Sequence, residues 1–253
     1  MGWRIYAASA VGSSHLDKGI PCQDACAFHV EGELLTAVVC DGAGSAARSD
    51  VGARLIADGL ARALGERLAR EPELLAGPRE DFAAAAAEAV TQARAALVER
   101  ADADGRALGD YAATVVGYAG DAQGGWFLHI GDGIGVAEAV DADAAAPVVS
   151  LPANGEYANE TWFVTGEGWR EQLRVLRVPA PTARLALMSD GAMPFAMARG
   201  NAALYAPFID PVSRYLASVD EDTGSRALHG TLADPRTHGI TSDDKTLLIA
   251  LRG

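Results

Sequence analysis

The sequence predicts an α+β fold: a four-layer αββα sandwich in which two mostly antiparallel sheets pack face to face and helices cover both outer faces. Strand-like segments are short and frequent, and several are joined by tight turns such as Glu31-Gly32, which is typical of antiparallel meanders. Helical segments follow each of two batches of strands. No linker of domain-boundary character and no internal repeat interrupts the chain, so residues 1–253 are expected to form a single domain.

Strand candidates are apolar runs bounded by glycine, aspartate, asparagine or proline. The run of alanine and aspartate at 141–146 lacks such a pattern and is expected to be a solvated loop. The predicted strands are residues 3–10, 25–30, 34–40, 112–118, 125–130, 133–140, 174–178, 184–188 and 246–251.

Two long segments carry helical periodicity. From residue 49 to about residue 70, apolar side chains fall on one stripe, and Gly44-Ser45 is expected to cap its start. A second stripe runs from 80 to about 100, and prolines and glycines around residue 77 separate the two into a helical hairpin. Both segments are rich in alanine, which allows close packing on a sheet. A further helical stretch, 201–216, continues in a second helix to 228 before the last strand.

The charge balance excludes a class of partners. The chain has 253 residues, 21 Lys plus Arg against 34 Asp plus Glu, and a net charge of -13. Binding to nucleic acid or to an anionic membrane needs a basic excess, so neither partner is expected. The N-terminus has no apolar run of signal-peptide length, and no later run reaches the length of a membrane span. These features predict a soluble, cytoplasmic protein.

Three cysteines, Cys22, Cys26 and Cys40, are an odd number in a chain too long to need disulfide staples. Reduced thiols in a reducing compartment are expected. The alternative, a zinc site with His15 or His29, has little support because the spacing matches no standard zinc pattern.

Aspartate recurs at the ends of the predicted strands. A single Asp-Gly pair after a strand is most simply a hairpin turn. Aspartates at the ends of several strands need a further explanation, because carboxylates gathered at one rim of a sheet repel one another unless cations compensate their charge. Oxygen ligands without histidine favour Mg²⁺ or Mn²⁺ over Zn²⁺, and a glycine beside the ligand lets its carbonyl turn toward the ion. The motifs are Cys22-Gln23-Asp24, Cys40-Asp41-Gly42, Gly131-Asp132-Gly133, Ser189-Asp190-Gly191 and Ser242-Asp243-Asp244.

The order of these motifs resembles a known family. QDA, VVCDGAGS, AATVVGYAG, IGDG, MSDGA and SDDKT occur in the order found in metal-dependent serine/threonine phosphatases of the protein phosphatase 2C (PP2C) type, here of the bacterial single-domain kind. The resemblance spans Asp24 to Asp244. Each motif is weak alone, whereas six in order are specific. The family's central β-sandwich with outer helices agrees with the pattern above.

The resemblance implies roles for individual residues. Asp41 would bridge two Mn²⁺ or Mg²⁺ ions with the Gly42 carbonyl on one of them, and Asp190 and Asp243 would complete the other shell. Asp24 would act through or beside a bound water, and Asp132 would join Asp190 at a third, looser ion. Thr114 matches a small-hydroxyl motif with a structural role.

The implied chemistry is hydrolysis of a phosphate monoester by a metal-bridging hydroxide, with no covalent phosphoenzyme. The chain carries no P-loop, no G-x-S-x-G elbow and no arginine cradle after Cys40. Two departures from the family stand out. Many members carry a phosphate-binding arginine before the acidic pair, where this chain has His15 and Lys18; either could bind phosphate, and His15 could also donate a proton. Gln23 replaces a common glutamate and could hold a metal-bound water.

Residues 151–172 mix glycine, aromatic and polar residues, and in the family a flap occupies this region. Tyr157, Asn159 and Trp162 are therefore candidates for contacts to a phosphoprotein. The alternative is a surface loop with one or two aromatic anchors.

The preferred function is a serine/threonine protein phosphatase that opposes a kinase. The alternatives are a non-catalytic phosphoprotein-binding module and a phosphatase for small metabolites.

Overall fold

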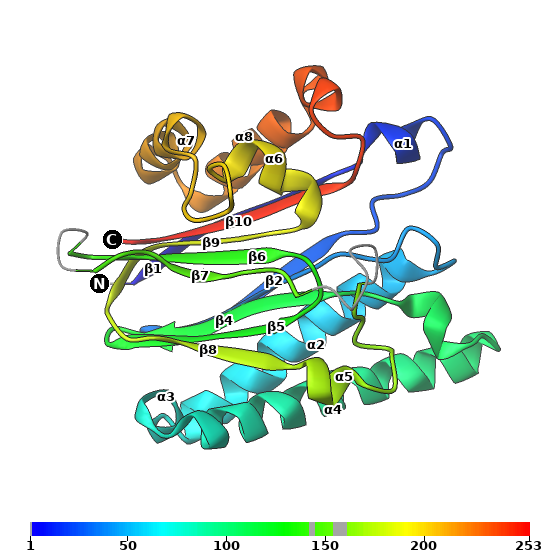
Figure 1. Cartoon of the computed structure of the whole chain (residues 1–253), viewed down its shortest axis with the longest axis horizontal. Helices are drawn as coiled ribbons and strands as arrows, with labels where there is room; N and C mark the ends of the chain where they lie inside the picture. The colour runs from blue at the N-terminus through cyan, green and yellow to red at the C-terminus, as the bar shows by residue number, and fades with distance from the viewer. Residues whose placement is uncertain (1, 142–144, 154–160) are drawn as a thin grey trace.

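Two five-stranded antiparallel sheets pack face to face in the computed structural model, which describes residues 2–141, 145–153 and 161–253. Helices cover both outer faces, so the predicted four-layer αββα architecture is confirmed (Figure 1). One sheet has the order β1 (Trp3–Ala10), β10 (Lys245–Arg252), β9 (Thr182–Met188), β6 (Ile134–Ala139) and β7 (Val148–Ser150). The other has the order β2 (Ala25–Glu31), β3 (Leu34–Cys40), β4 (Val115–Asp121), β5 (Gly124–Ile130) and β8 (Arg174–Val178).

The helices form two unequal outer layers. Beside the β2–β8 sheet lie α2 (Ser49–Arg70), α3 (Glu73–Ala76), α4 (Arg79–Asp104) and α5 (Trp169–Gln172). Beside the β1–β7 sheet lie α6 (Met193–Ala196), α7 (Ala206–Ser218) and α8 (Glu221–Leu232). The remaining short helices are α1 (Ser13–Leu16) and the 3₁₀ turns η1 (Leu108–Tyr111), η2 (Asp190–Ala192) and η3 (Pro235–Gly239).

The alternation of side chains along each strand builds three apolar layers. On β10, Leu247 and Ile249 pack toward the α6–α8 layer, whereas Leu248 and Ala250 pack between the sheets. The two faces of a strand therefore serve different layers. The first and last strands are neighbours, with Trp3 opposite Arg252 and Ala10 opposite Lys245.

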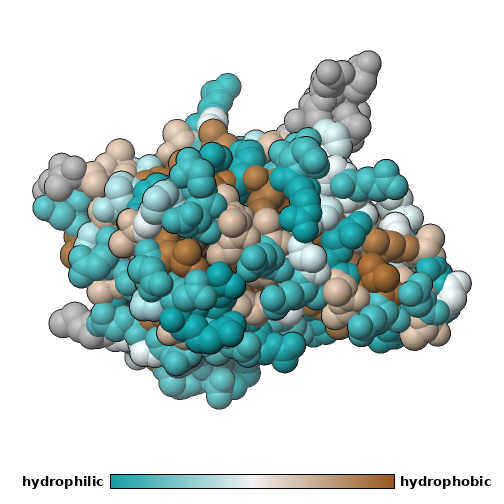
Figure 2. Space-filling view, turned by 90° about the horizontal axis from the view of Figure 1, so that it is seen from below, coloured by the Kyte–Doolittle hydropathy of each residue, from teal (hydrophilic) through white to brown (hydrophobic). Residues whose placement is uncertain are grey.

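The long helices pack as the periodicity predicts. Ile56, Leu60 and Leu64 of α2 are fully buried against the sheet, and Phe82 of α4 stacks on Trp126 of β5 with ring centroids 5.2 Å apart. The outer face of this layer is mostly hydrophilic with scattered apolar patches (Figure 2). The apolar stripes thus point inward, as expected for helices that lie on a sheet.

Several boundaries differ from the prediction. The strand predicted at 112–118 begins only at Val115, since the preceding residues turn toward the end of β3. The N-terminal cap of α2 is Arg48 and makes no side-chain cap bond, so the cap expected from Gly44-Ser45 is wrong. Residues 201–205 form a bend and a bridge from Leu204 to Met197 rather than the start of a helix, and the short elements β7 and α3 have too few residues for a periodic signal. Part of the 141–146 loop lies outside the described residues.

Cys22, Cys26 and Cys40 are free thiols, and burial raises the pKa of Cys26 to about 11 and that of Cys40 well above its usual value. Within the described part of the chain, no helix has the length and apolar character needed to cross a membrane.

Candidate active site

The predicted aspartates gather at one rim of the sandwich. Asp41 follows β3, Asp190 follows β9, and Asp243 precedes β10, while Asp132 lies between β5 and β6. These strand ends meet at the side of the molecule where α1 lies (Figure 1). The antiparallel order brings together residues that are far apart in sequence.

A cavity of about 220 Å³ lies among these side chains. It is smaller than the pockets that hold a whole organic ligand, so its size suits a phosphoryl group and ions. Its lining comes from the ends of β3, β5 and β9, the start of β10, α1 and the segment after residue 160: His15, Asp41, Gly42, Ala43, Gly44, Ser45, Thr114, Asp132, Thr161, Phe163, Asp190, Asp243 and Asp244.

Backbone bonds fix Asp41 and Gly42. The Asp41 N–H donates to Thr114 Oγ1 at 3.1 Å, and the Thr114 N–H donates to the Asp41 carbonyl at 2.8 Å. The Gly42 N–H donates to the Gln23 carbonyl at 3.1 Å. A Cβ at Gly42 would lie 2.5 Å from that carbonyl oxygen and 2.8 Å from Ser49 Cβ. Close packing therefore requires glycine here, a reason additional to the carbonyl freedom inferred from the sequence, and Thr114 has the structural role expected of it.

A second glycine turns the chain into the site. Gly131 has φ +109°, and a Cβ there would lie 2.6 Å from Thr114 Cγ2. Because L-residues with side chains avoid this region, the turn that presents Asp132 depends on glycine. Thr161 Oγ1 donates to Asp132 Oδ2 at 2.8 Å, which fixes that carboxylate.

Asp24 is the most enclosed of the predicted ligands. Its side chain is buried behind the cavity, where Oδ2 accepts a bond of 2.6 Å from Ser189 Oγ. Ser189 Oγ in turn accepts from the Thr246 N–H at 2.9 Å. Burial, together with the Asp244 carboxylate, raises the pKa of Asp24 to about 7 despite the bond from Ser189. The protein without cations thus disfavours a negative charge at this position.

The other carboxylates influence one another. Burial raises the pKa of Asp41 well above its usual range, and the charges of Asp24, Asp190 and Asp132 raise it further. Burial also raises the pKa of Asp190, to which Asp243 and Asp132 contribute. Asp41, Asp132, Asp190 and Asp243 line one cavity, as the sequence pattern of aspartates at strand ends predicts, and neighbouring carboxylates repel one another there.

Several oxygens lack partners. Asp24 Oδ1, Asp132 Oδ1, Asp190 Oδ1 and Gln23 Oε1 are buried and have no hydrogen-bond partner in the part of the chain that the structure describes. Buried acceptors without donors are costly. Among the described residues, no group of three or more His, Cys, Asp or Glu side chains has the arrangement of a metal-binding cluster. The all-oxygen donor set nevertheless fits hard divalent cations, which would neutralise the repelling carboxylates and fill the unpartnered positions.

Asp244 is a site residue that the sequence reasoning missed. Its buried carboxylate accepts bonds from the Gly12 N–H at 2.7 Å and the Gln23 N–H at 2.6 Å, and it lies 3.0 Å from His15 Nδ1. It thus joins α1, the segment before β2 and the start of β10. The adjacent pair Asp243-Asp244 was the available signal, but a sequence cannot tell which of two neighbouring aspartates accepts the bonds from Gly12 and Gln23.

The remaining predicted residues have different locations. His15 is buried and lines the cavity, with Nδ1 directed at Asp244. Gln23 is buried behind the cavity, and Lys18 is exposed and does not line it. Trp162 is half-buried against the α2–α4 core, as the anchoring alternative for residues 151–172 predicts. Tyr157 and Asn159 lie outside the described residues.

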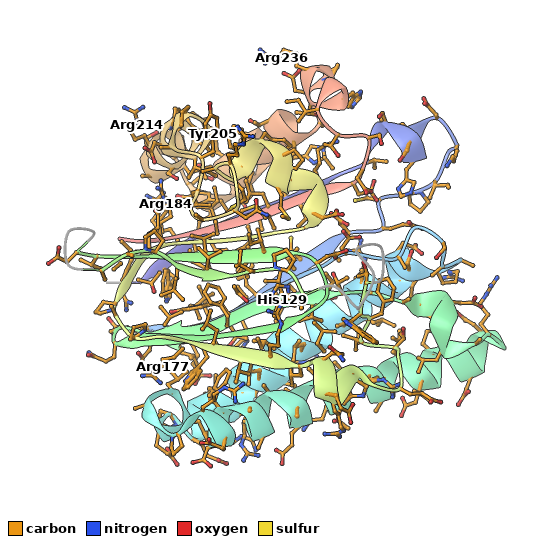
Figure 3. All side chains as sticks on the ribbon, in the orientation of Figure 1. His129, Arg177, Arg184, Tyr205, Arg214 and Arg236 are labelled. Carbon is orange, nitrogen blue, oxygen red and sulfur yellow. The ribbon has the colours of Figure 1, made fainter. Side chains whose placement is uncertain are left out.

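A buried polar group lies next to the site. His129 of β5 points between the two sheets (Figure 3), and its Nδ1 is 2.9 Å from Ser150 Oγ. Burial and the nearby Arg174 guanidinium lower the pKa of His129 to about 3. Arg174 donates to the Leu151 carbonyl at 2.7 Å, so this group braces the chain that leads away from β7.

The site is a rim of convergent aspartates on an αββα sandwich, and comparison with known proteins identifies the class. The family model described as protein phosphatase 2C matches residues 11–233, and the chain belongs to this family of serine/threonine phosphatases.

Individual relatives agree with this membership. Serine/threonine-protein phosphatase 3 of Escherichia coli K12 is 32% identical over 260 residues, which cover 99% of each chain. The solved structure of the serine/threonine phosphatase Stp1 from Staphylococcus aureus is 13% identical with a TM-score of 0.60, covering 100% of this chain and 96% of that one. PppA of Pseudomonas aeruginosa, titled a key regulatory component of T6SS, is 17% identical with a TM-score of 0.58, covering 99% and 98%. The two structures support the fold.

Proposed function

We propose that this chain is a Mn²⁺- or Mg²⁺-dependent phosphoprotein phosphatase that hydrolyses phosphoserine and phosphothreonine and so opposes a serine/threonine kinase. The observation that carries the proposal is the group of aspartates around a small cavity, where burial and neighbouring charges raise the pKa of Asp41 and of Asp190. Such a group destabilises the fold unless cations bind there. The free thiols fit a reducing cytoplasm.

The ligand roles follow from position. Asp41, Asp190 and Asp243 line the cavity and would hold two cations, together with the Gly42 carbonyl. Asp24 lies behind them and would act through water, and Asp132 would join Asp190 at a third ion. When bound, such ions lower the pKa of water to give a nucleophilic hydroxide and screen the phosphoryl oxygens.

His15 supports the departure of the leaving group. With Nδ1 on Asp244, its Nε2 is the ring nitrogen left for the cavity. We assign it the proton that the seryl or threonyl oxygen takes as its bond to phosphorus breaks. His15 is then left neutral, with the Nδ1 proton still donated to Asp244. Gln23 and Lys18 stay candidates for contacts to water and to the substrate surface.

The test is hydrolysis of 4-nitrophenyl phosphate with and without Mn²⁺, on wild type, Asp41→Asn and Asp190→Asn. Asp222→Asn, in the exposed first turn of α8, is the matched control. We expect no turnover without metal, a loss of at least about 100-fold in each site variant and none in the control. Metal-independent turnover, or full activity in both site variants, would refute the mechanism.

A second assay separates the alternatives. A phosphothreonine peptide should be hydrolysed with a higher kcat/KM than 4-nitrophenyl phosphate. Peptide binding without turnover would instead indicate a binding module, and turnover of small esters alone would indicate a metabolite phosphatase.

A further inference from the structure

A second, larger hollow opens from the candidate active site. Its volume is about 830 Å³, and it shares Asp132, Thr161 and Asp190 with the smaller cavity. From there it extends over α6 to a turn at residues 198–201. A phosphorylated residue in the small cavity would therefore have its neighbours along the chain in this groove.

The middle of the groove is lined by Leu151, Pro152, Met193, Pro194 and Met197. These side chains are uncharged and mostly apolar, so they can pack against an extended chain without selecting its sequence. Selectivity for particular peptide sequences must therefore come from the charged residues of the groove, Asp132, Asp190 and Arg199.

The turn at the far end is firmly built. Met197 and Leu204 form an antiparallel bridge, the Ala198 N–H donates to the Ala203 carbonyl at 2.9 Å, and the Asn201 N–H donates to the Ala198 carbonyl at 2.9 Å. Gly200 has φ +82° and Asn201 has φ +57°, the left-handed conformations that glycine and asparagine tolerate best. The turn therefore has one defined shape, and it carries Arg199 at the edge of the groove.

Arg199 is exposed, and its side chain has no hydrogen bond or ion pair with any residue that the structure describes. Arg184 shows the contrast, because Glu138 at 2.6 Å and Asp210 at 2.9 Å hold its guanidinium. In a chain with a net charge of -13, an arginine that lines the same groove as Asp132 and Asp190 and has no partner among the described residues is a distinctive feature. A guanidinium binds carboxylate or phosphate through two parallel hydrogen bonds.

We propose that this groove binds the polypeptide next to the phosphorylated residue and that Arg199 selects substrates with an acidic side chain there. The inference rests on the proposed phosphatase function and specifies its substrate class. Without Arg199, an acidic segment would meet only the negative field of the site and of the surface. With it, the same segment gains an attractive contact at one fixed position.

The experiment compares Arg199→Ala and Arg199→Glu with wild type. Arg214→Ala is the matched control, because Arg214 is an exposed arginine on α7, at the end of the molecule away from α1 (Figure 3). The substrates are 4-nitrophenyl phosphate and three sets of phosphothreonine peptides that carry Asp, Asn or Lys at one of positions two to four residues from the phosphothreonine, on either side.

Wild type should show a kcat/KM about two- to five-fold higher for Asp than for Asn at one of these positions, the size expected of an exposed ion pair. Arg199→Ala should abolish this ratio, Arg199→Glu should favour Lys, and Arg214→Ala should change neither. The Asp preference of wild type should decrease as salt is raised, because salt screens exposed charges. All variants should hydrolyse 4-nitrophenyl phosphate at the wild-type rate.

The outcomes separate the two proposals. If 4-nitrophenyl phosphate and the peptides are hydrolysed but the Asp:Asn:Lys ratios are the same in wild type and Arg199→Glu, the specificity inference is wrong and the phosphatase function stands. If neither substrate is hydrolysed with Mn²⁺, the proposed function fails and the inference fails with it.

Discussion

His129 should make the protein less stable as the pH falls. Its ring is buried between the sheets, with Nδ1 bonded to Ser150 Oγ, and its pKa is lowered from 6.5 to about 3 by burial and by Arg174. The unfolded chain binds a proton below pH 6.5, whereas the folded chain binds one only near pH 3. The free energy of unfolding therefore decreases as the pH falls from about 6.5 toward 3, and the folded state is most stable above pH 6.5.

The magnitude follows from the two pKa values. The full difference between 6.5 and about 3 corresponds to about 5 kcal/mol, of which about 2 kcal/mol is lost between pH 8 and pH 5. Other groups also titrate in this range, including Asp24, whose raised pKa acts in the opposite direction. The comparison between wild type and His129→Gln removes their contribution.

The assay is urea unfolding followed by the fluorescence of the four tryptophans, at pH 8, 7, 6 and 5, with EDTA present so that metal binding does not contribute. The difference in unfolding free energy between wild type and His129→Gln should fall by about 2 kcal/mol from pH 8 to pH 5. Ser150→Ala keeps the titratable ring and should retain the wild-type slope. Parallel curves for wild type and His129→Gln would refute the reasoning.

Two further predictions concern the site. Asp244→Asn keeps the shape of the acceptor but removes the charge that orients His15. With Mn²⁺ present, kcat should therefore fall at least about ten-fold for phenyl phosphate. The loss should be smaller for 4-nitrophenyl phosphate, because its leaving group needs less protonation. An equal loss for both esters would count against the orienting role. Gly42→Ala should lower the free energy of unfolding by about 2 kcal/mol or more, because its Cβ would lie 2.5 Å from the Gln23 carbonyl oxygen. The control is Gly44→Ala, whose Cβ would meet nothing within 4 Å and should change this free energy little. Chemical denaturation measures both. Similar stability of the two alanine variants would show that the backbone at Gly42 can relax.

The sequence was informative where a physical pattern repeats. The mostly apolar segments Trp3–Ala10 and Leu34–Cys40 and the stripe on α2 carry enough residues to define their elements, and the structure has these strands with the predicted boundaries. Asp41, Asp132 and Asp190 were predicted as site residues because each follows a strand and lies beside glycine, a pattern that can be recognised in the sequence alone.

Other features depend on contacts that a sequence does not contain. Asp244 and Asp243 are chemically the same residue type side by side, and only the direction of the chain at the start of β10 distinguishes their roles. Arg199 lies just before the segment 201–216 that was predicted as helix, where the left-handed Gly200 and Asn201 give no periodic signal. Its lack of a partner is a property of the folded molecule alone.

The pairing of β1 with β10 bears on how the molecule is assembled. Among the described residues β1 pairs with β10 alone in its sheet, so β1 has no strand partner until the distant β10 joins it. Asp243 and Asp244 arrive with that same strand. A contact between residues this far apart is entropically expensive and slow to form. The group of aspartates around the cavity is therefore complete only once β10 has paired with β1 and β9.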